Sequence, residues 1–357
     1  MLNKEFWKNK NVFLTGHTGF KGGWLSLLLK SLGANLTGYS LEPEDNKSFF
    51  KELKIEEDMS SVIGDIRDFD KLSSSIKLCN PEIIIHMAAQ PLVGKSYEDP
   101  IETYSTNVMG TVNLFESVRK IDNLRAILNV TTDKCYKNQE WSWGYRENDM
   151  LGGHDPYSNS KACSELVTSS FRQSFFDPSN YSDHGVSIAS ARAGNVIGGG
   201  DFTKGRLIPD IMDVIYGNSS ERLVLRNPSA VRPWQHVLEP LKGYLMLIEK
   251  QIDEGPSYSK PWNFGPLIED SITVSSVIEI IERLTSKDLK IAQENSDIHE
   301  TSILRLDISN VQSELNWKPS LSIDESIELA LEWYKAFYIQ DLDIIALTLG
   351  QINRYIK

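Results

Sequence analysis

Apolar residues in the first half of the chain form short continuous runs, separated by longer stretches with helical spacing. A short apolar run bounded by turn residues is typical of a strand buried on both faces of a parallel sheet. The pattern predicts strands at 11–15, 35–40, 61–65, 82–87, 126–131 and 186–191, and helices at 24–32 (capped by Gly33), 100–121 and 157–175. Strands that alternate with helices predict an α/β fold with a Rossmann-type, doubly wound parallel sheet.

The alternation ends at about residue 194. After three consecutive glycines at 198–200 the expected elements are shorter and mixed, with amphipathic helices predicted at 273–284 and 323–337. The chain is also long enough for two domains. We therefore expect a Rossmann domain over 1–190 that also takes in 230–265, and a smaller C-terminal α/β domain, which caps the substrate, over most of 191–357.

Composition excludes several classes of partner. The formal net charge of −12 argues against binding to nucleic acid or to an anionic membrane. The chain shows no apolar signal segment at its start and no apolar run long enough to span a bilayer, so a cytoplasmic protein is expected. Three cysteines without close spacing suggest reduced thiols, and six scattered histidines give no reason to expect a metal.

Gly16, Gly19 and Gly22 lie between the first predicted strand and the first predicted helix, in the sequence GHTGFKG. Small residues there let the backbone approach a pyrophosphate, which the helix N-terminus then holds. The spacing is G-x-x-G-x-x-G, and such a turn also occurs as an ordinary strand–helix connection. Its place on the first strand of an alternating α/β chain favours a dinucleotide.

The end of the second predicted strand bears on which dinucleotide is bound. Ser40 stands where an aspartate is usual, and Glu42 either supplies the carboxylate for a ribose or lies in solvent. No arginine follows nearby to bind a 2′-phosphate, so NAD is expected rather than NADP. Asp65 and Ile66, after the third strand, either line the adenine or form the N-cap of the next helix.

Tyr157 and Lys161 form the one Tyr-x-x-x-Lys pair in the chain, and residues four apart share a face of a helix. A free phenol has a pKa of about 10, so a tyrosine that acts as a base near neutral pH needs a neighbouring cation. We expect Lys161 to lower the pKa of Tyr157 and to reach a bound ribose. The pair indicates a nicotinamide enzyme that takes hydride from an alcohol.

Thr132, Asp133 and Lys134 come directly after a predicted buried strand. A hydroxyl, a carboxylic acid and an amine at the carboxyl edge of a sheet suit acid–base chemistry. The same residues also suit a polar turn closed by the aspartate side chain, and the local pattern by itself favours that alternative.

With these three motifs in order, the chain resembles the extended short-chain dehydrogenase/reductase superfamily over about residues 10–240. Further matches are HMAAQ at 86–90, NVMGT at 107–111, RAGNV at 192–196 and RPWQHV at 232–237. Within the superfamily it is most similar to nucleotide-sugar 4,6-dehydratases, on residues 16–24, 132–136 and 195–201. The related dTDP-glucose enzymes carry Asp-Glu where this chain has Asp133-Lys134, which favours a branch that acts on CDP-sugars.

The resemblance implies an NAD-dependent lyase that acts on a nucleotide diphosphate sugar, expected to be CDP-glucose, by C4 oxidation, C5–C6 elimination and hydride return to C6. Tyr157 would take the proton of the 4-hydroxyl, Thr132 would hold that hydroxyl, and Lys161 would anchor the nicotinamide ribose. Lys134 is the expected base at C5, and Asp133 the acid for the departing 6-hydroxyl. Lys134 then needs a site that suppresses its charge, because a free lysine titrates near about 10.4.

The resemblance also implies the remaining contacts. Cofactor binding is expected from Gly16, Thr18, Gly19, Phe20, Lys21, Gly22, Asp65, Ile66, Ala88, Ala89, Gln90, Asn107, Tyr157 and Lys161. Substrate binding, mainly in the C-terminal domain, is expected from Gln90, Asn195, Arg206, Arg232 and His299, unless the two arginines form surface ion pairs. The helices at 100–121 and 157–175 would pair subunits in a homodimer or homotetramer, unless their apolar stripes belong to the core.

Three alternatives are weighed. A nucleotide-sugar 4-epimerase would share the fold, NAD, Tyr157 and Lys161, but it has no use for an acid–base couple beside Thr132. A 4,6-dehydratase for another NDP-hexose is also compatible, because no residue by itself identifies the base. A dinucleotide sensor that has lost its chemistry is disfavoured, since such proteins usually lose the tyrosine or the lysine.

Overall fold

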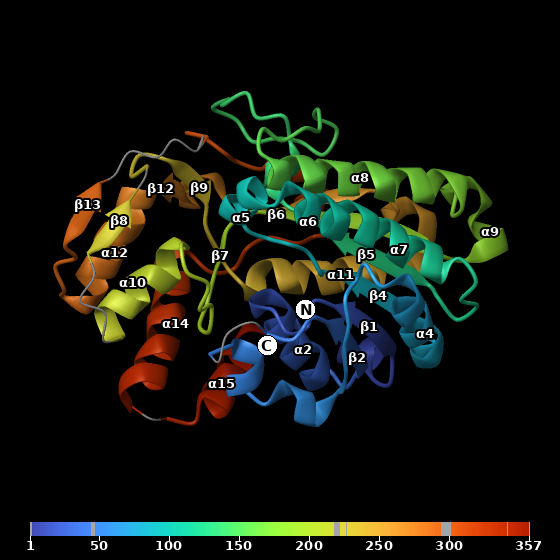
Figure 1. The fold of residues 1–357 in the computed structure, drawn as a ribbon, viewed down its shortest axis with the longest axis horizontal. Helices are drawn as coiled ribbons and strands as arrows, with labels where there is room; N and C mark the ends of the chain where they lie inside the picture. Colours follow the sequence, from blue (N-terminus) through green and yellow to red (C-terminus); the bar gives the residue numbers. More distant parts are fainter. Residues whose placement is uncertain are drawn as a thin grey trace.

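A computed structural model describes residues 2–43, 47–217, 222–225, 227–293, 301–340 and 342–356. At its centre lies a parallel sheet of seven strands in the order β11-β6-β5-β4-β1-β2-β3 (Figure 1). The strands are β1 (Asn11–Thr15), β2 (Asn35–Ser40), β3 (Ser60–Ile63), β4 (Ile83–His86), β5 (Ala126–Val130), β6 (Ser187–Ala193) and β11 (Pro261–Phe264). Strand order reverses between β1 and β4, which is where doubly wound sheets bind ligands. The predicted fold class is confirmed.

Helices cover both faces of this sheet (Figure 1). One face packs against α2 (Phe20–Ser31) and α11 (Leu238–Glu254), and the other against α4 (Phe69–Cys79), α7 (Gly110–Val118) and α8 (Pro156–Ser174). Successive residues of a strand point to opposite faces. Val12 and Leu14 of β1 accordingly join the first core, while Phe13 joins the second. Burial on both faces explains why most positions of the central strands are apolar, although β6 also buries Ser187, Ser190 and Arg192.

A smaller α/β part lies beside the sheet, at the left of Figure 1. Its strands pair as β7 (Val196–Ile197) with β10 (Gln235–His236), β8 (Leu223–Leu225) with β13 (Ile291–Gln293), and β9 (Val231–Pro233) with β12 (Ser271–Thr273). Its helices are α10 (Leu207–Tyr216), α12 (Val274–Thr285), α14 (Ile323–Lys335) and α15 (Ile344–Ile356). Short helices elsewhere are α1 (Lys4–Trp7), α3 (Phe49–Glu52), α5 (Val93–Glu98), α6 (Pro100–Tyr104), α9 (Tyr181–His184) and α13 (Ser309–Glu314). Among the described residues, no helix combines the length and apolar character needed to cross a bilayer.

Three sequence predictions about the elements need correction. The helix predicted at 100–121 is α6, a π-helical turn at Ser105–Met109, and α7, which ends at Val118. Leu32 is the C-cap of α2, and Gly33 follows it with φ +88, a conformation that glycine adopts readily. The elements after residue 194 are not all short, because α11 is 17 residues long.

Candidate active site

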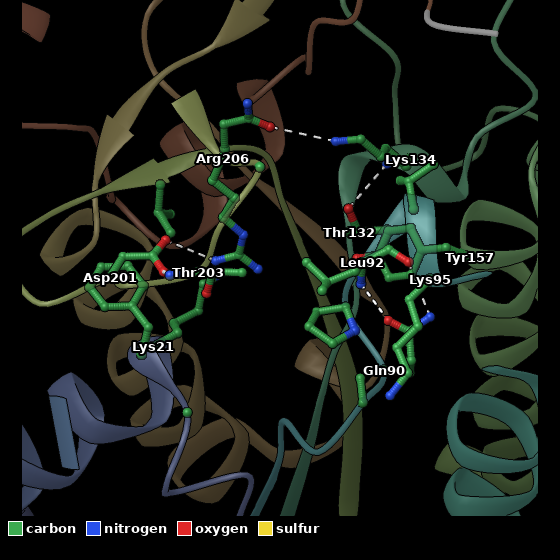
Figure 2. A pocket seen from close by; sticks show the side chains of 18 of the residues that line it. Lys21, Gln90, Leu92, Lys95, Thr132, Lys134, Tyr157, Asp201, Thr203 and Arg206 are labelled. Atoms are coloured by element: carbon green, nitrogen blue, oxygen red, sulfur yellow. Dashed lines mark hydrogen bonds and ion pairs between the residues drawn. The ribbon is translucent and has the colours of Figure 1, made fainter. Parts of the chain in front are cut away.

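A cavity of about 1820 Å³ opens at the carboxyl edge of the sheet, lined by residues that follow β1, β4, β5 and β6. Parallel strands end at one edge, so motifs far apart in sequence meet there. Thr132, Lys134 and Tyr157 lie on one wall, and Lys21, Asp201, Thr203 and Arg206 on the facing wall (Figure 2). The structure thus brings the five predicted catalytic residues, Thr132, Asp133, Lys134, Tyr157 and Lys161, around one space.

The turn after β5 is a short 3-10 helix, Asp133–Cys135. Thr132 caps it: its Oγ1 accepts a hydrogen bond from the backbone N–H of Lys134 (3.3 Å) and donates to Asp133 Oδ1 (2.9 Å). The alternative interpretation, in which the aspartate side chain closes the turn, is therefore wrong. Because the cap is the threonine, the carboxylate of Asp133 and the amine of Lys134 are left for other contacts.

Asp133 and Lys134 form a close pair, with 3.6 Å between Lys134 Nζ and Asp133 Oδ1. The Asp133 side chain is fully buried, and the structure gives its Oδ2 no hydrogen-bond partner among the described residues. Lys134 is 29% exposed and also donates to Asn195 Oδ1, at 3.5 Å. Asn195 follows β6, so this contact joins the ends of two strands.

Tyr157 and Lys161 lie on the first turns of α8 and are both buried. Burial raises the pKa of Tyr157 to about 12, while a hydrogen bond with Thr132 acts in the opposite direction. Burial also lowers the pKa of Lys161 to about 8, and its Nζ donates to the carbonyl oxygen of Val130 (3.3 Å). The net shift in the pKa of Tyr157 is therefore opposite to the one expected from sequence, because loss of water around the phenolate outweighs the hydrogen bond with Thr132 and the cation of Arg206.

The glycine turn between β1 and α2 leaves no room for side chains. A Cβ on Gly22 would come within 2.0 Å of the carbonyl oxygen of Gly16, and one on Gly16 within 2.8 Å of the amide nitrogen of Ala88. Gly16 also has φ +81. The N-terminus of α2 therefore faces the cavity with bare backbone, which is the arrangement that binds a diphosphate.

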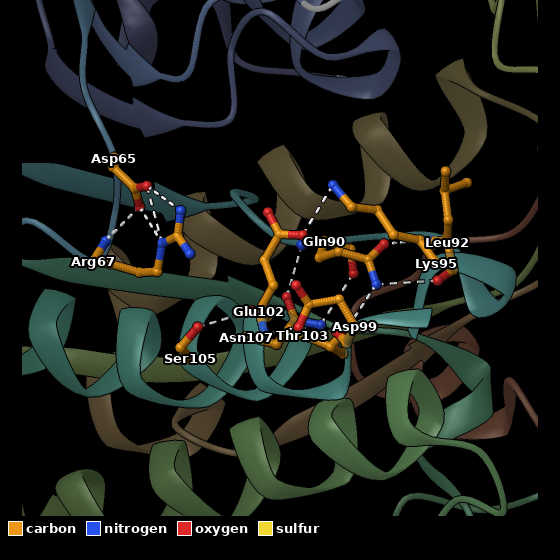
Figure 3. Close-up of polar contacts among 10 residues, drawn as sticks. All are labelled: Asp65, Arg67, Gln90, Leu92, Lys95, Asp99, Glu102, Thr103, Ser105 and Asn107. Atoms are coloured by element: carbon orange, nitrogen blue, oxygen red, sulfur yellow. Dashed lines mark hydrogen bonds and ion pairs between the residues drawn. The ribbon is translucent and has the colours of Figure 1, made fainter. Parts of the chain in front are cut away.

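Several predicted cofactor residues lie around this turn and line the cavity: Thr18, Gly19, Phe20, Asp65, Ile66, Ala88 and Ala89. The hydroxyl of Thr18 lies 2.8 Å from Ser40 Oγ and donates to the carbonyl oxygen of Leu41, so it fixes the end of β2. Asp65 is not a helix cap, because Asp68 caps α4; Asp65 binds Arg67 through both carboxylate oxygens instead (Figure 3). Glu42 is exposed at the cavity edge.

Of the two predicted contact residues Gln90 and Asn107, Gln90 lines the cavity, whereas Asn107 does not. The Gln90 side chain donates to Thr103 Oγ1 and accepts from the amide of Leu92 (Figure 3). Asn107 lies behind the cavity lining in the π-helical turn, where its amide bonds the backbone N–H and C=O of Gln90 at 2.8 and 3.0 Å. Asn107 thus fixes the cavity wall, and π turns are frequent at such positions.

The two predicted diphosphate arginines both line the cavity. Arg206 forms an ion pair with Asp201 at 2.9 Å on the cavity wall. Arg232 is only 9% exposed and donates to the carbonyl oxygen of Val231. His299 lies outside the described residues. Among those described, no cluster of His, Cys, Asp or Glu could hold a metal ion.

A buried ion pair behind the catalytic turn was not among the residues predicted from sequence. Glu165 of α8 binds Arg192 of β6 at 2.9 Å, with both side chains 3% exposed. The same carboxylate accepts from Thr131 Oγ1 (2.5 Å) and Ser190 Oγ (2.6 Å). Two features of the sequence could have indicated this pair. Arg192 is a charged residue near the end of a predicted buried strand, and Glu165 lies four residues after Lys161, on the same face of the helix.

A stack of aromatic rings joins this ion pair to the surface. Arg192 lies over the ring of Tyr136, which stacks on Tyr145, which in turn stacks on Trp141. Arg192 also donates to Tyr136 Oη at 2.8 Å. The stack ends at the exposed Trp143, in the loop that follows the catalytic turn. The outer loop and the catalytic turn are therefore held by one continuous set of contacts.

The parallel sheet, the glycine turn on β1 and the Tyr157/Lys161 pair define a short-chain dehydrogenase/reductase of the extended type. A family model described as "GDP-mannose 4,6 dehydratase" matches residues 13–330. The chain belongs to this family of nucleotide-sugar dehydratases.

Individual relatives agree with that assignment. The chain is 50% identical, over its full length and 99% of the relative, to a CDP-glucose 4,6-dehydratase of Salmonella typhimurium. It is 24% identical to a dTDP-glucose 4,6-dehydratase of Xanthomonas campestris, over 90% of this chain and 92% of that protein.

Solved structures share the fold. A UDP-glucose 4-epimerase of Thermotoga maritima, solved with UDP-glucose, has a TM-score of 0.79 at 18% identity, over 91% of this chain and 99% of the other. A dTDP-glucose 4,6-dehydratase of Bacillus anthracis in complex with NAD has a TM-score of 0.74 at 22% identity, over 91% and 96% of the two chains.

Proposed function

We propose that this chain is an NAD-dependent CDP-glucose 4,6-dehydratase that forms CDP-4-keto-6-deoxyglucose and water. The observation that carries the proposal is the Asp133–Lys134 pair beside Thr132 and Tyr157 in one cavity. An epimerase needs only the tyrosine and a hydride acceptor, whereas elimination of water also needs a base and an acid. The 50% identity to a CDP-glucose 4,6-dehydratase supports the choice of base and sugar.

The cavity fits a dinucleotide at the glycine turn. The backbone of Gly16, Gly19, Phe20 and Gly22 is open to a diphosphate, and any side chain at Gly22 would collide with Gly16. Asp65, Ile66, Ala88 and Ala89 continue this lining and would hold the adenosine and nicotinamide portions. Bound NAD would supply the hydride acceptor for C4 and the hydride donor for C6, so that the reaction has no net redox change.

The protein's own groups would handle the protons. Tyr157 Oη accepts the proton of the sugar 4-hydroxyl, and Thr132 Oγ1 holds that hydroxyl in line. Lys161, with a pKa lowered to about 8 by burial, retains a large charged fraction at neutral pH and stabilises the phenolate as it forms. Positioned groups of this kind contribute about 10²–10⁴-fold in rate.

The Asp133–Lys134 pair would supply both groups that elimination needs. In the ion pair, the one proton that the two groups can share is on Lys134 Nζ. Transfer of that proton across the 3.6 Å contact to Asp133 Oδ1 leaves a neutral amine and a carboxylic acid. The amine then takes the C5 proton, and the acid protonates the departing 6-hydroxyl, which leaves as water. Lys134 later returns its proton to C5 when hydride reaches C6, and the proton that Tyr157 took from the 4-hydroxyl then restores the Asp133–Lys134 ion pair.

Replacing Lys134 with alanine is expected to lower the rate of product formation by about 10²–10⁴-fold. Oxidation at C4 does not require this amine, so reduced cofactor should still accumulate from substrate, while exchange of the C5 proton with solvent stops. Absorbance and mass spectrometry in deuterated water measure the two steps. Lys77→Ala on the exposed face of α4 is the matched control. Full turnover by K134A would remove Lys134 from the scheme.

The function itself is tested by incubating the protein with NAD and, separately, CDP-, UDP-, dTDP- and GDP-glucose. We expect loss of one water from the CDP-sugar alone, seen by mass. Loss of water from another nucleotide sugar would change the assigned base but keep the reaction. A product of unchanged mass with inverted C4 would replace dehydration by epimerisation.

We further propose a homodimer or homotetramer in the cytoplasm. Exposed apolar residues on α6 and α8, such as Ile101 and Leu166, support pairing through these helices. Cys79, Cys135 and Cys163 are free thiols, which suits a reducing compartment.

A further inference from the structure

Lys21 is a cation that the chemistry described so far does not use. It is the second residue of α2, between Gly19 and Gly22 of the glycine motif, and it lines the cavity. Figure 2 places it on the wall with Asp201, Thr203 and Arg206, across from Thr132 and Tyr157. The backbone of the turn already suffices for a cofactor diphosphate, so the side chain is available for another contact.

The surroundings of Lys21 are strongly cationic. Its ammonium interacts electrostatically with the cations of Arg206, Lys161 and Lys134, and with the carboxylate of Asp133. Burial lowers the pKa of Lys21 to about 8, and the cations of Arg206 and Lys161 act in the same direction. Like charges gathered in an enclosed cavity cost free energy, which a bound anion offsets.

No carboxylate among the described residues forms an ion pair with Lys21. Within the part of the chain that the structure describes, its Nζ has no hydrogen-bond or ion-pair partner. The carboxylate of Asp201, on the same wall, binds Arg206 at 2.9 Å and accepts from the backbone amide of Thr203 at 3.1 Å. A half-buried ammonium that lines a cavity and has no such partner indicates a missing anionic ligand.

We propose that the Lys21 ammonium binds the diphosphate of the nucleotide-sugar substrate, together with Arg206. Lys21 is thereby a substrate-binding residue carried on the cofactor turn, and the inference rests on the proposed function for its nucleotide sugar. Two features favour the substrate's diphosphate over the cofactor's. The strongest electrostatic neighbour of Lys21 is Arg206, which lies outside the glycine turn, and the remaining neighbours are catalytic residues of the sugar pocket.

The test is Lys21→Met, which keeps the length of the side chain and removes its charge. Calorimetry would measure the affinities for CDP, cytidine and NAD separately. We expect the affinity for CDP to fall about ten- to hundredfold, as for loss of a charged hydrogen bond, with cytidine and NAD little changed. KM for the nucleotide sugar should rise far more than kcat falls, and Lys21→Arg should recover most of the affinity. Lys30→Met, on the last turn of the same helix, is the control and should leave the affinities for CDP, cytidine and NAD unchanged.

Each other outcome is decisive. Unchanged CDP affinity in K21M overturns the proposal, as does an equal loss for NAD and CDP, which would assign Lys21 to the cofactor's diphosphate. If the wild-type protein prefers another nucleoside diphosphate, the base assigned above is wrong, and the comparison of K21M with wild type is made with that nucleotide. If the wild-type protein binds none, the proposed function and the role of Lys21 both fail.

Discussion

Replacing Tyr157 with phenylalanine is expected to lower kcat by about 10²–10⁴-fold, with little change in the affinity for NAD. The ring stays packed, because phenylalanine has the same shape, and only the hydroxyl is lost. Tyr157 is 9% exposed, so water has little access to replace it as the proton acceptor. Steady-state kinetics and a separate measurement of NAD binding distinguish the two effects.

The pH dependence of the hydride step sharpens this prediction. Burial raises the pKa of Tyr157 to about 12, so the phenol is neutral near pH 7 and its basic form increases as pH rises. The single-turnover rate of the wild-type protein should therefore rise with pH, and that of Y157F should not follow it. Tyr104→Phe removes a hydroxyl that bonds Asn159 on the helix pair outside the cavity and serves as the control. A Y157F variant with more than a tenth of wild-type activity would exclude Tyr157 as the base.

Replacing Arg192 with methionine is expected to lower the free energy of unfolding by about 3–5 kcal/mol. The change leaves the Glu165 carboxylate buried without its cation, and it also removes the contacts with Tyr136. Urea denaturation, followed by fluorescence, measures the loss. Glu165→Leu combined with R192M should recover part of it, because the double variant leaves no uncompensated charge.

A surface ion pair provides the comparison. Arg354 binds Glu332 at 3.2 Å, and the two side chains are 61% and 44% exposed. Arg354→Met should therefore lower the free energy of unfolding by at most about 1 kcal/mol. Equal losses for R354M and R192M would show that burial of the Glu165–Arg192 pair has no energetic consequence.

The sequence was sufficient for the strands of the sheet that have clear apolar runs. β1, β4 and β5 were found because both of their faces are covered, so most of their positions are apolar. β6 was found as well, although it also buries Ser190 and Arg192. β11 is four residues long and begins with a proline, and α11 has Pro240 and Gly243 in its first turns. Their local propensity is poor. β11 and α11 form because they pack on the sheet, and this tertiary packing cannot be read from the local sequence pattern.

The candidate site was predictable where motifs follow strands, because parallel strands deliver those motifs to one edge. Thr132, Lys134 and Tyr157 were placed in one pocket for this reason. The proximity of Lys21 to Arg206 was not predictable, since it depends on how the loop after β7 returns to α2. The pKa of Tyr157 was also beyond sequence reasoning, because its direction is set by burial rather than by the nearby lysine.

The return of β11 to the main sheet has a consequence for how the protein is made. β6 ends at Ala193, but its neighbour β11 begins only at Pro261, after most of the strands beside the sheet have been passed. During synthesis the open edge of β6 therefore waits for the ribosome to add that whole segment, and exposed strand edges are prone to wrong pairing. A nascent chain halted near residue 200 would be a natural substrate for chaperones.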